Sequence, residues 1–363
     1  MRTFEVPGIA LAIVKDDTVV VAKGYGVRRL GDPAPVDART LFGIASNTKA
    51  FTATALGLLV EDGKIEWDDR VIRYLPSFAM WDPYVTRELT VRDLLVHRSG
   101  FGLGAGDLLW WPESTYNRKE IAERLRFIPP ATSFRAAYAY DNVLYLVAGE
   151  LIEAVSGQSW EDFVTSRILR RIGMTGTNVR HSAGGNVAAT HARVVLTNQE
   201  SGEAFDSIAF WILDHYLEAP TFDWIDGYKR MLDRIRARTQ AVETQAAASR
   251  HADSRPSLPI ANYAGTYRDA WYGDVDITAE NGKLTLRFTH TPALVGPLEH
   301  WQYDTFIARW RDRELRADAF VTFALRPDGS IDQVKMAAVS PATDFSFDFQ
   351  DLLLKPSPAN QPK

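Results

Sequence analysis

Apolar and polar residues alternate in two short stretches near the start of the chain, and the spacing then becomes helical. Residues 9–14 and 18–22 are rich in small and β-branched apolar residues, with the polar triplet Lys15-Asp16-Asp17 between them. This pattern predicts two paired strands. Residues 51–62 place apolar side chains at helical spacing and stop at Gly63. They predict a buried helix that ends at a glycine in the left-handed conformation.

The middle of the chain has helical periodicity, and a break in composition follows it. Four further helices are expected, at residues 141–155, 160–172, 204–216 and 224–238. From residue 240 to 259 the chain is rich in Ala, Gln, Ser, Arg and Pro with little periodicity. That composition predicts a linker or a frayed helix.

Beyond residue 259 the pattern becomes that of an all-β domain. Asn281-Gly282 between two alternating runs predicts a hairpin with a two-residue turn. A second hairpin is expected from residues 320–325 and 331–336, and strict alternation at residues 345–349 predicts a half-buried strand. Short strands at this spacing predict a small antiparallel barrel or sandwich. Four large aromatic residues are expected in its core: Trp301, Tyr303, Phe306 and Trp310.

Composition narrows the possible functions. A chain of 363 residues with 46% hydrophobic content has room for about two domains. The net charge of -5 gives no basic surplus for nucleic-acid binding, and no apolar run approaches the ~18 residues of a membrane helix. The absence of cysteine excludes disulfides and thiolate metal sites, and the 7 histidines form no H-E-x-x-H motif or close pair, so neither a metal nor a cofactor is predicted. No signal-peptide pattern precedes residues 6–10, so the chain as written is expected to be cytoplasmic.

Two short motifs carry candidate chemistry. Ser46 is the only serine with lysine three residues later, Lys49, and Tyr140 is the only tyrosine with asparagine two residues later, Asn142. Residues three apart on a helix share a face, which would place the Lys49 amine beside the Ser46 hydroxyl. A serine nucleophile needs a base, and lysine serves as one only where its pKa is lowered toward neutrality. A phenol from Tyr140 would share the proton transfers, and Asn142 would hold Lys49 or a substrate amide.

Each of these residues also has a non-catalytic interpretation. Taken alone, Ser46 could cap a helix, Lys49 could be solvated and Tyr140 could belong to the core. His97, in the run Leu95 to Gly100, is interpreted as structural, and Ser99 has no lysine partner. No G-x-S-x-G elbow occurs, which argues against an α/β-hydrolase.

The surroundings of the two motifs resemble the serine β-lactamase and penicillin-binding-protein-like family, in its class C β-lactamase, D-aminopeptidase and esterase branch. The resemblance covers roughly residues 4–217. It implies an α+β fold with a β-lactamase/transpeptidase-like antiparallel sheet flanked by helices. It also implies that Ser46 is the acylated nucleophile, Lys49 the general base and Tyr140 the group that handles the leaving-group proton. The runs that carry it are Leu41 to Thr52, Leu56 to Val60, Glu61 to Ile65, Trp67 to Asp69, Leu89 to Gly100 and Tyr145 to Glu153.

The same resemblance implies a domain plan and a substrate class. Residues 1–239 would form the hydrolase domain, 240–259 the linker, 260–355 a barrel that resembles the lipocalin-like domain often appended to this family, and 356–363 a disordered tail. The partner would be a small-molecule or peptide substrate: a D-amino-acid peptide, a β-lactam or a small ester. Members of the family are largely exported, which points to a periplasmic or secreted protein. The oligomeric state stays open.

One motif of the family is missing. No triplet of Lys or His, then Thr or Ser, then Gly occurs: His181-Ser182-Ala183-Gly184 and His290-Thr291-Pro292 both depart from it. Relatives carry several helices and the motif-bearing strand where this chain joins Val194 directly to Val195, so an internal deletion is predicted and the sheet would be incomplete. The second N–H donor of the oxyanion hole would be lost with that strand, at a cost of about 10²- to 10³-fold in turnover.

Three hypotheses follow. The chain is an acyl-enzyme hydrolase acting through Ser46, or a degenerate member of the family that binds or only slowly acylates, or a small-ligand binding module seated in the C-terminal barrel. Turnover distinguishes the first hypothesis from the second. Ligand affinity retained without residues 1–239 would distinguish the third.

Overall fold

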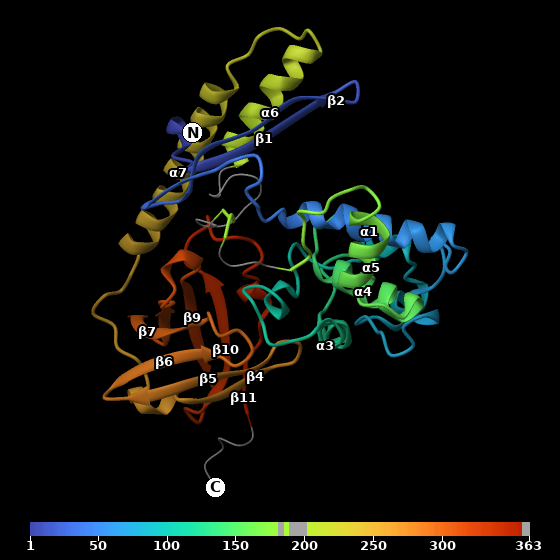
Figure 1. The fold of residues 1–363 in the computed structure, drawn as a ribbon. Helices are drawn as coiled ribbons and strands as arrows, with labels where there is room; N and C mark the ends of the chain where they lie inside the picture. Colours follow the sequence, from blue (N-terminus) through green and yellow to red (C-terminus); the bar gives the residue numbers. More distant parts are fainter. Residues whose placement is uncertain (181–184, 189–201, 358–363) are drawn as a thin grey trace. The chain divides into compact units, whose positions relative to one another are not determined.

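The computed structural model describes residues 1–180, 185–188 and 202–357, which form two compact units (Figure 1). The first unit contains residues 1–51 and 161–241, and the second contains residues 52–160 and 242–363. In the part of the chain that the structure describes, no helix is both long enough and apolar enough to cross a membrane.

A three-stranded antiparallel sheet forms the start of the first unit. It contains β1 (Gly8–Lys15), β2 (Thr18–Arg29) and β3 (Asp32–Pro35), in that order. Asp16 and Asp17 form the turn between β1 and β2, both with positive φ, 50° and 58°. Acidic and amide residues tolerate this conformation better than other side chains, which matches a tight hairpin turn. The predicted strand pair is therefore confirmed.

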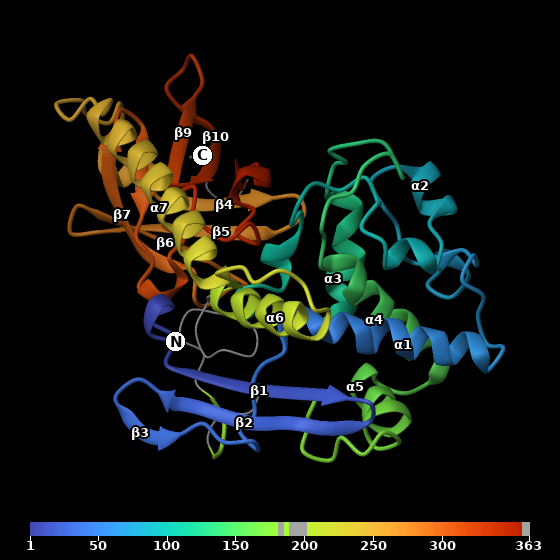
Figure 2. The same ribbon diagram turned by 90° about the horizontal axis from the view of Figure 1, so that it is seen from above.

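Two helices accompany this sheet. Figures 1 and 2 show α6 (Gly202–Tyr216) beside β1. Buried Ala204 of α6 packs with Phe4, Val6 and Ile9, and partly buried residues of α6 and α7 (Trp224–Ala248) complete this small core. Apolar residues of α6 and α7 recur at helical spacing on the side that faces the core, which explains why these segments are helical.

Helix α7 is longer than the sequence predicted. It was expected to end at residue 238, before a linker or frayed helix, but it continues to Ala248. The added residues, 239–248, are mostly Ala, Gln and Glu, which have good helix propensity and need no buried face to extend a helix.

The motif Tyr140-x-Asn142 lies in the second unit, immediately before helix α4 (Val143–Ser156). Helix α4 buries Val143, Val147 and Leu151 on one face and ends at Gly157, whose φ is 71° and whose N–H bonds to the carbonyl of Glu153. Helix α3 packs against α4 and begins with a capping box between Asn117 and Glu120. The predicted helix at 160–172 is a short α-helix followed by a π-helical turn at Thr165–Leu169. The helices that lie wholly in the second unit are α2 (Pro83–Glu88), α3 (Arg118–Arg124) and α4 (Val143–Ser156). Helices α1 (Thr48–Glu61) and α5 (Trp160–Val164) contain residues of both units.

The rest of the second unit is one curved antiparallel sheet, drawn in orange and red in Figure 1. Its strand order is β10-β9-β8-β7-β6-β5-β4-β11, and Val334 of β10 also pairs with Leu354 beside β11, so the two ends of the sheet meet. The predicted all-β barrel is confirmed at this level. The strands are β4 (Gly265–Asp269), β5 (Gly273–Glu280), β6 (Lys283–Phe288), β7 (Val295–Gln302), β8 (Thr305–Ala308), β9 (Ala319–Leu325), β10 (Ile331–Ala338) and β11 (Lys355–Pro356).

Both predicted hairpins of the barrel are present. β5 and β6 are joined by Asn281 and Gly282, with φ of 51° and 72°, as a two-residue turn requires. β9 pairs with β10 across the turn that contains Gly329. Of the aromatic residues expected in the core, Phe306 and Trp310 are buried and Trp301 is half-buried. The expectation for Tyr303 was wrong, because it lies in the β7–β8 turn with φ 46° and is 53% exposed.

The strand predicted at residues 345–349 is absent. Phe345 and Ser346 form a turn, and a 3₁₀ turn begins at Phe349. Alternation favours a strand only when one side of it faces water. Here both sides of the segment are buried, Phe347 and Phe349 on one side and Ser346 and Asp348 on the other. Ser346 and Asp348 can be buried because their side chains form hydrogen bonds with residues 106–108.

A buried carboxylate, Asp93, connects the segment that follows α2 to the segment that precedes α4. Asp93 accepts hydrogen bonds from the backbone N–H and hydroxyl of Thr90, at 2.9 and 2.7 Å, and from Nε of Arg135 at 2.9 Å. Burial alone would raise the pKa of Asp93, but the bonds from Arg135 and Thr90 outweigh it and hold that pKa below its ordinary value.

This lowered pKa predicts a loss of stability in acid. The unfolded chain binds the proton more readily than the folded chain, so the stabilisation is present above the ordinary Asp pKa of about 3.9 and is lost as the pH falls below it. We expect the free energy of unfolding of wild type, followed by urea unfolding between pH 3 and 6, to fall in acid more steeply than that of Asp93→Asn. The same slope in both proteins would contradict the assignment, and Asp253→Asn, at an exposed position, serves as the control.

Candidate active site

Ser46 and Lys49 lie at the beginning of helix α1. Ser46 is on a 3₁₀ turn, Ala45–Asn47, and α1 itself begins at Thr48 rather than at Ser46. Lys49 Nζ is 3.2 Å from Ser46 Oγ, within hydrogen-bond distance. Ser46 is exposed and Lys49 is half-buried. The predicted side-by-side arrangement of this hydroxyl and this amine is therefore present.

The backbone around Ser46 holds its side chain at the helix entrance. Ala45 has φ 39°, an uncommon conformation for a residue with a side chain, and Asn47 donates both its backbone N–H and its Nδ2 to the carbonyl of Ile44. Ser46 consequently precedes the first turn of α1, where backbone N–H groups and the positive end of the helix dipole favour negative charge. An oxyanion formed from a group attached to Ser46 would be stabilised there.

Tyr140 and Asn142 lie just before helix α4. Asn142 is its N-cap residue and is buried, and its Nδ2 donates to Asp107 Oδ2 at 2.8 Å. The ring of Tyr140 is half-buried and stacks on His97, with ring centroids 4.5 Å apart. The carbonyl of Tyr140 accepts the N–H of Gly104. Both side chains therefore have positions fixed by neighbouring groups.

His97 contacts the same segment. Its Nδ1 accepts the backbone N–H of Asp141 at 3.2 Å, and its ring packs near those of Tyr138, Tyr140 and Tyr145. His97 is buried and has φ 56°. These contacts are those of a residue that positions the Tyr140 segment, in line with the structural interpretation from the sequence.

The structure brings some of the predicted site residues together within each unit. Ser46 and Lys49 belong to the first unit, and Tyr140 and Asn142 belong to the second. Sequence reasoning missed Asp107, which is fully buried and accepts hydrogen bonds from Asn142 and from Ser346. Ser346 lies 239 positions from Asp107, so no local sequence signal connects them.

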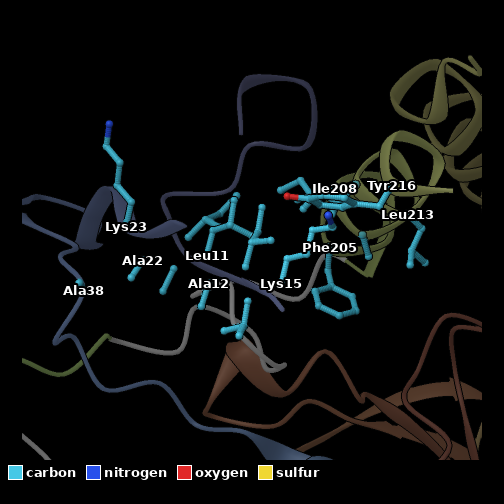
Figure 3. Close-up of a pocket in the computed structure, with 16 residues that line it drawn as sticks. Leu11, Ala12, Lys15, Ala22, Lys23, Ala38, Phe205, Ile208, Leu213 and Tyr216 are labelled. Atoms are coloured by element: carbon cyan, nitrogen blue, oxygen red, sulfur yellow. The ribbon is translucent and has the colours of Figure 1, made fainter. Parts of the chain in front are cut away.

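A separate apolar pocket lies in the first unit (Figure 3). It measures about 790 Å³ and is bordered by β1 and α6, with Leu11, Phe205 and Leu213 among the apolar side chains that line it. Lys15 and Lys23 supply the charged groups. The described residues that line this pocket include no serine, histidine or carboxylate, so the candidate nucleophile is not one of them.

Three predictions from the sequence fall wholly or mostly outside the described residues. They are the near-match to the missing motif at residues 181–184, the junction of Val194 with Val195, and the tail at residues 356–363, of which residues 358–363 are outside. Among the residues that the structure does describe, no three His, Asp or Glu side chains gather as ligands of a metal ion would.

Comparison with known proteins assigns the family. Residues 2–248, well over half of the chain, match the model of the Beta-lactamase family. The chain belongs to this beta-lactamase family. Residues 249–356 match a second model, described as a domain of unknown function (DUF3471).

Similar curated proteins include hydrolases of fungi and bacteria. The chain is 32% identical over 188 residues to the unguisins hydrolase ungD of Aspergillus violaceofuscus (strain CBS 115571), covering 50% of this chain and 33% of that protein. It is 30% identical over 191 residues to a putative D-alanyl-D-alanine carboxypeptidase of Escherichia coli (strain K12), covering 47% and 43%. The matched part is thus less than half of either relative.

Solved structures with similarity include a D-amino acid amidase from Ochrobactrum anthropi SV3 complexed with L-phenylalanine amide, 29% identical over 47% of each chain with a TM-score of 0.41. An octameric penicillin-binding protein homologue from Pyrococcus abyssi is 18% identical, covering 98% of this chain and 97% of that one, with a TM-score of 0.44. By their names, the proteins similar to this beta-lactamase family member include a hydrolase, a carboxypeptidase and an amidase.

Proposed function

We propose that the chain is a serine hydrolase that cleaves an amide or an ester through an acyl-enzyme on Ser46. The observation that carries the proposal is the 3.2 Å contact between Lys49 Nζ and Ser46 Oγ at the entrance of α1. It lies within the residues that match the beta-lactamase model. A serine hydroxyl beside an amine is the pairing that nucleophilic catalysis needs.

In this mechanism Ser46 Oγ attacks the substrate carbonyl and Lys49, in its neutral form, accepts the hydroxyl proton. The oxyanion of the tetrahedral intermediate is stabilised by N–H groups at the start of α1. As the intermediate collapses, the leaving group takes a proton with the help of Tyr140, and Asn142 holds the substrate amide. Water then attacks the acyl-enzyme, and Ser46 is regenerated by the reverse proton transfers.

The substrate class follows from the same proposal. We propose a small-molecule or peptide substrate, with a D-amino-acid peptide, a β-lactam or a small ester as the candidates. A hydrolase, a carboxypeptidase and an amidase among the relatives support an acyl-transfer substrate. Loop residues around a site, rather than the fold, decide among such substrates.

The division into domains is also a proposal. Residues 1–239 would be the hydrolase domain, residues 240–259 the linker, of which residues 240–248 continue α7, and residues 260–355 a lipocalin-like barrel. We propose further that the sequence carries an internal deletion between Val194 and Val195, because no Lys/His-Thr/Ser-Gly triplet occurs in it. This absence favours a second candidate function, that of an impaired family member that binds substrate or acylates slowly.

Lys49 provides the first test. Replacing it with alanine is expected to lower kcat/KM for p-nitrophenyl acetate by about 10²- to 10⁴-fold, because the proton acceptor for Ser46 is lost. Lys49→Arg should not restore activity, since a guanidinium stays protonated in proteins. The release of p-nitrophenol from each purified variant measures the effect.

Lys64→Ala, at an exposed lysine near the other end of the same helix, is the matched control and should retain wild-type turnover. The elution volume of every variant in size-exclusion chromatography is recorded, so that a loss of activity caused by aggregation is not mistaken for a loss of catalysis. Equal turnover by wild type, Lys49→Ala and Lys64→Ala would exclude Lys49 as the base. Acylation without sustained turnover by wild type would favour the impaired family member.

A further inference from the structure

The C-terminal domain reaches the Tyr140-x-Asn142 segment through residues 345–348. These residues follow β10 and pack on the loop at residues 104–108, within the second unit. Asp348 Oδ2 accepts the N–H of Gly106 at 2.6 Å, and its Oδ1 accepts the N–H of Leu108 at 3.2 Å. Asp348 is fully buried, so the attachment is an internal one rather than a surface contact.

Ser346 extends this attachment to Asn142 through Asp107. Ser346 Oγ donates to Asp107 Oδ2 at 2.9 Å, and Asn142 Nδ2 donates to the same oxygen at 2.8 Å. Trp110 Nε1 donates to the other oxygen, Oδ1, at 3.2 Å. A carboxylate held by donors on both oxygens has one orientation, and it fixes the direction in which the Asn142 amide points.

Phe345 stands beside the ring of Tyr140. The two rings meet edge to face, with centroids 5.9 Å apart and an interplanar angle of 88°. Phe345 approaches so closely that a Cβ on Gly104 would lie 2.8 Å from its ring and its carbonyl oxygen, and Gly104 has φ +69°. Glycine is therefore required at 104 for this contact. Although Phe345 is held in place, 41% of it remains exposed, which leaves ring surface for a ligand.

We propose that the C-terminal domain completes the substrate site, with Phe345 binding an apolar leaving group beside Tyr140 and Ser346 positioning Asn142 through Asp107. This inference rests on the proposed function, in which Tyr140 serves the leaving group. The substrate class that it selects is an ester or amide whose leaving group carries an aromatic or other bulky apolar substituent. An aromatic ring of the leaving group that packs edge to face on Phe345 would change relative kcat/KM values several-fold.

Two acetyl esters test the role of Phe345, because they share an acyl group and differ in the ring of the leaving group. Hydrolysis of benzyl acetate and ethyl acetate is followed by pH-stat titration. Phe345→Ala is expected to lower the kcat/KM ratio of benzyl to ethyl ester by about fivefold. Leu353→Ala, which removes another exposed apolar side chain of the same C-terminal stretch, should leave the ratio within about twofold.

Ser346 is tested by a different signature. Ser346→Ala should lower kcat/KM by about fivefold for both esters, with their ratio unchanged, because Asp107 loses one donor and Asn142 is less firmly oriented. Ser346→Thr keeps a hydroxyl and should restore much of the loss, which a purely steric role would not predict. An unchanged kcat/KM in Ser346→Ala would overturn this half of the inference.

The outcomes separate the inference from the proposed function. If wild type hydrolyses these esters but Phe345→Ala leaves their ratio unchanged, the inference fails and the hydrolase proposal stands. If wild type hydrolyses neither ester, binding of N-benzylacetamide to Ser46→Ala, measured by saturation-transfer NMR, decides the inference, and the hydrolase proposal fails only if p-nitrophenyl acetate is not turned over either. A severalfold lower affinity for N-benzylacetamide in the double variant Ser46→Ala, Phe345→Ala than in Ser46→Ala supports the inference. Equal affinities, or no binding to Ser46→Ala, overturn it.

Discussion

Replacement of Ser46 by alanine is expected to reduce the turnover of p-nitrophenyl acetate by about 10³-fold or more. The Ser46 hydroxyl is the only group in the proposed mechanism that forms a covalent bond to the substrate. Removing a nucleophile of this kind abolishes nearly all rate enhancement. Ser46 is exposed on its turn, so its substitution should change stability little. Rates are measured for wild type and Ser46→Ala at equal concentration of correctly eluting protein.

Ser77→Ala is the matched control for this result. Ser77 is also an exposed serine, and it has no place in the proposed mechanism, so its substitution should leave turnover unchanged. If Ser46→Ala retained the activity of Ser77→Ala and wild type, a contaminant or another residue would be responsible, and the assignment of the nucleophile would be wrong.

Replacement of Asp348 by alanine is expected to destabilise the second unit by about 2–4 kcal/mol. The backbone N–H groups of Gly106 and Leu108 would lose their acceptor while remaining buried. Part of this cost is offset, because burial and the neighbouring Asp107 raise the pKa of Asp348 well above its ordinary value, so holding the charged form at this position is unfavourable. Urea unfolding followed by tryptophan fluorescence measures the change.

Two further variants sharpen that measurement. Asp348→Asn keeps a side-chain oxygen that can accept one of the N–H groups, and should cost less than Asp348→Ala. Asp253→Ala removes an exposed carboxylate and should have an effect within about 0.5 kcal/mol. An Asp348→Ala protein as stable as Asp253→Ala would show that residues 345–348 are not anchored to the loop at 104–108.

Elements with strong local patterns could be predicted from the sequence. The pair β1 and β2, helix α4 with its terminal Gly157, and the Asn281-Gly282 hairpin all follow from periodicity and turn chemistry over a few residues. The contact of Ser46 with Lys49 belongs to the same category, because their separation of three residues decides it once a helical turn forms.

Features set by distant residues could not be predicted. The alternation at residues 345–349 resembles a half-buried strand, yet Ser346 and Asp348 are buried because they find partners more than two hundred positions away. Helix α7 extends to Ala248 through residues whose composition and lack of periodicity predicted a linker or a frayed helix. The role of Asp107 as the shared acceptor for Asn142 and Ser346 likewise has no sequence signature.

The barrel interior bears on the hypothesis of a ligand-binding module. Tyr263, Phe306 and Phe323 are buried there and pack edge to face. The ring centroid of Tyr263 lies 5.1 Å from that of Phe306 and 4.8 Å from that of Phe323. Interior space in a small barrel is readily filled by such rings. This packing counts against a ligand seated among these rings.

Mass spectrometry of the protein quenched during turnover of p-nitrophenyl acetate shows whether Ser46 carries the acyl group. We expect an added acetyl group on wild type, located on the peptide that contains Ser46, and no such addition on Ser46→Ala. Turnover without any modified protein would leave the acyl-enzyme unsupported. An acetyl group on another residue, present equally in Ser46→Ala, would contradict the assignment of Ser46 as the nucleophile.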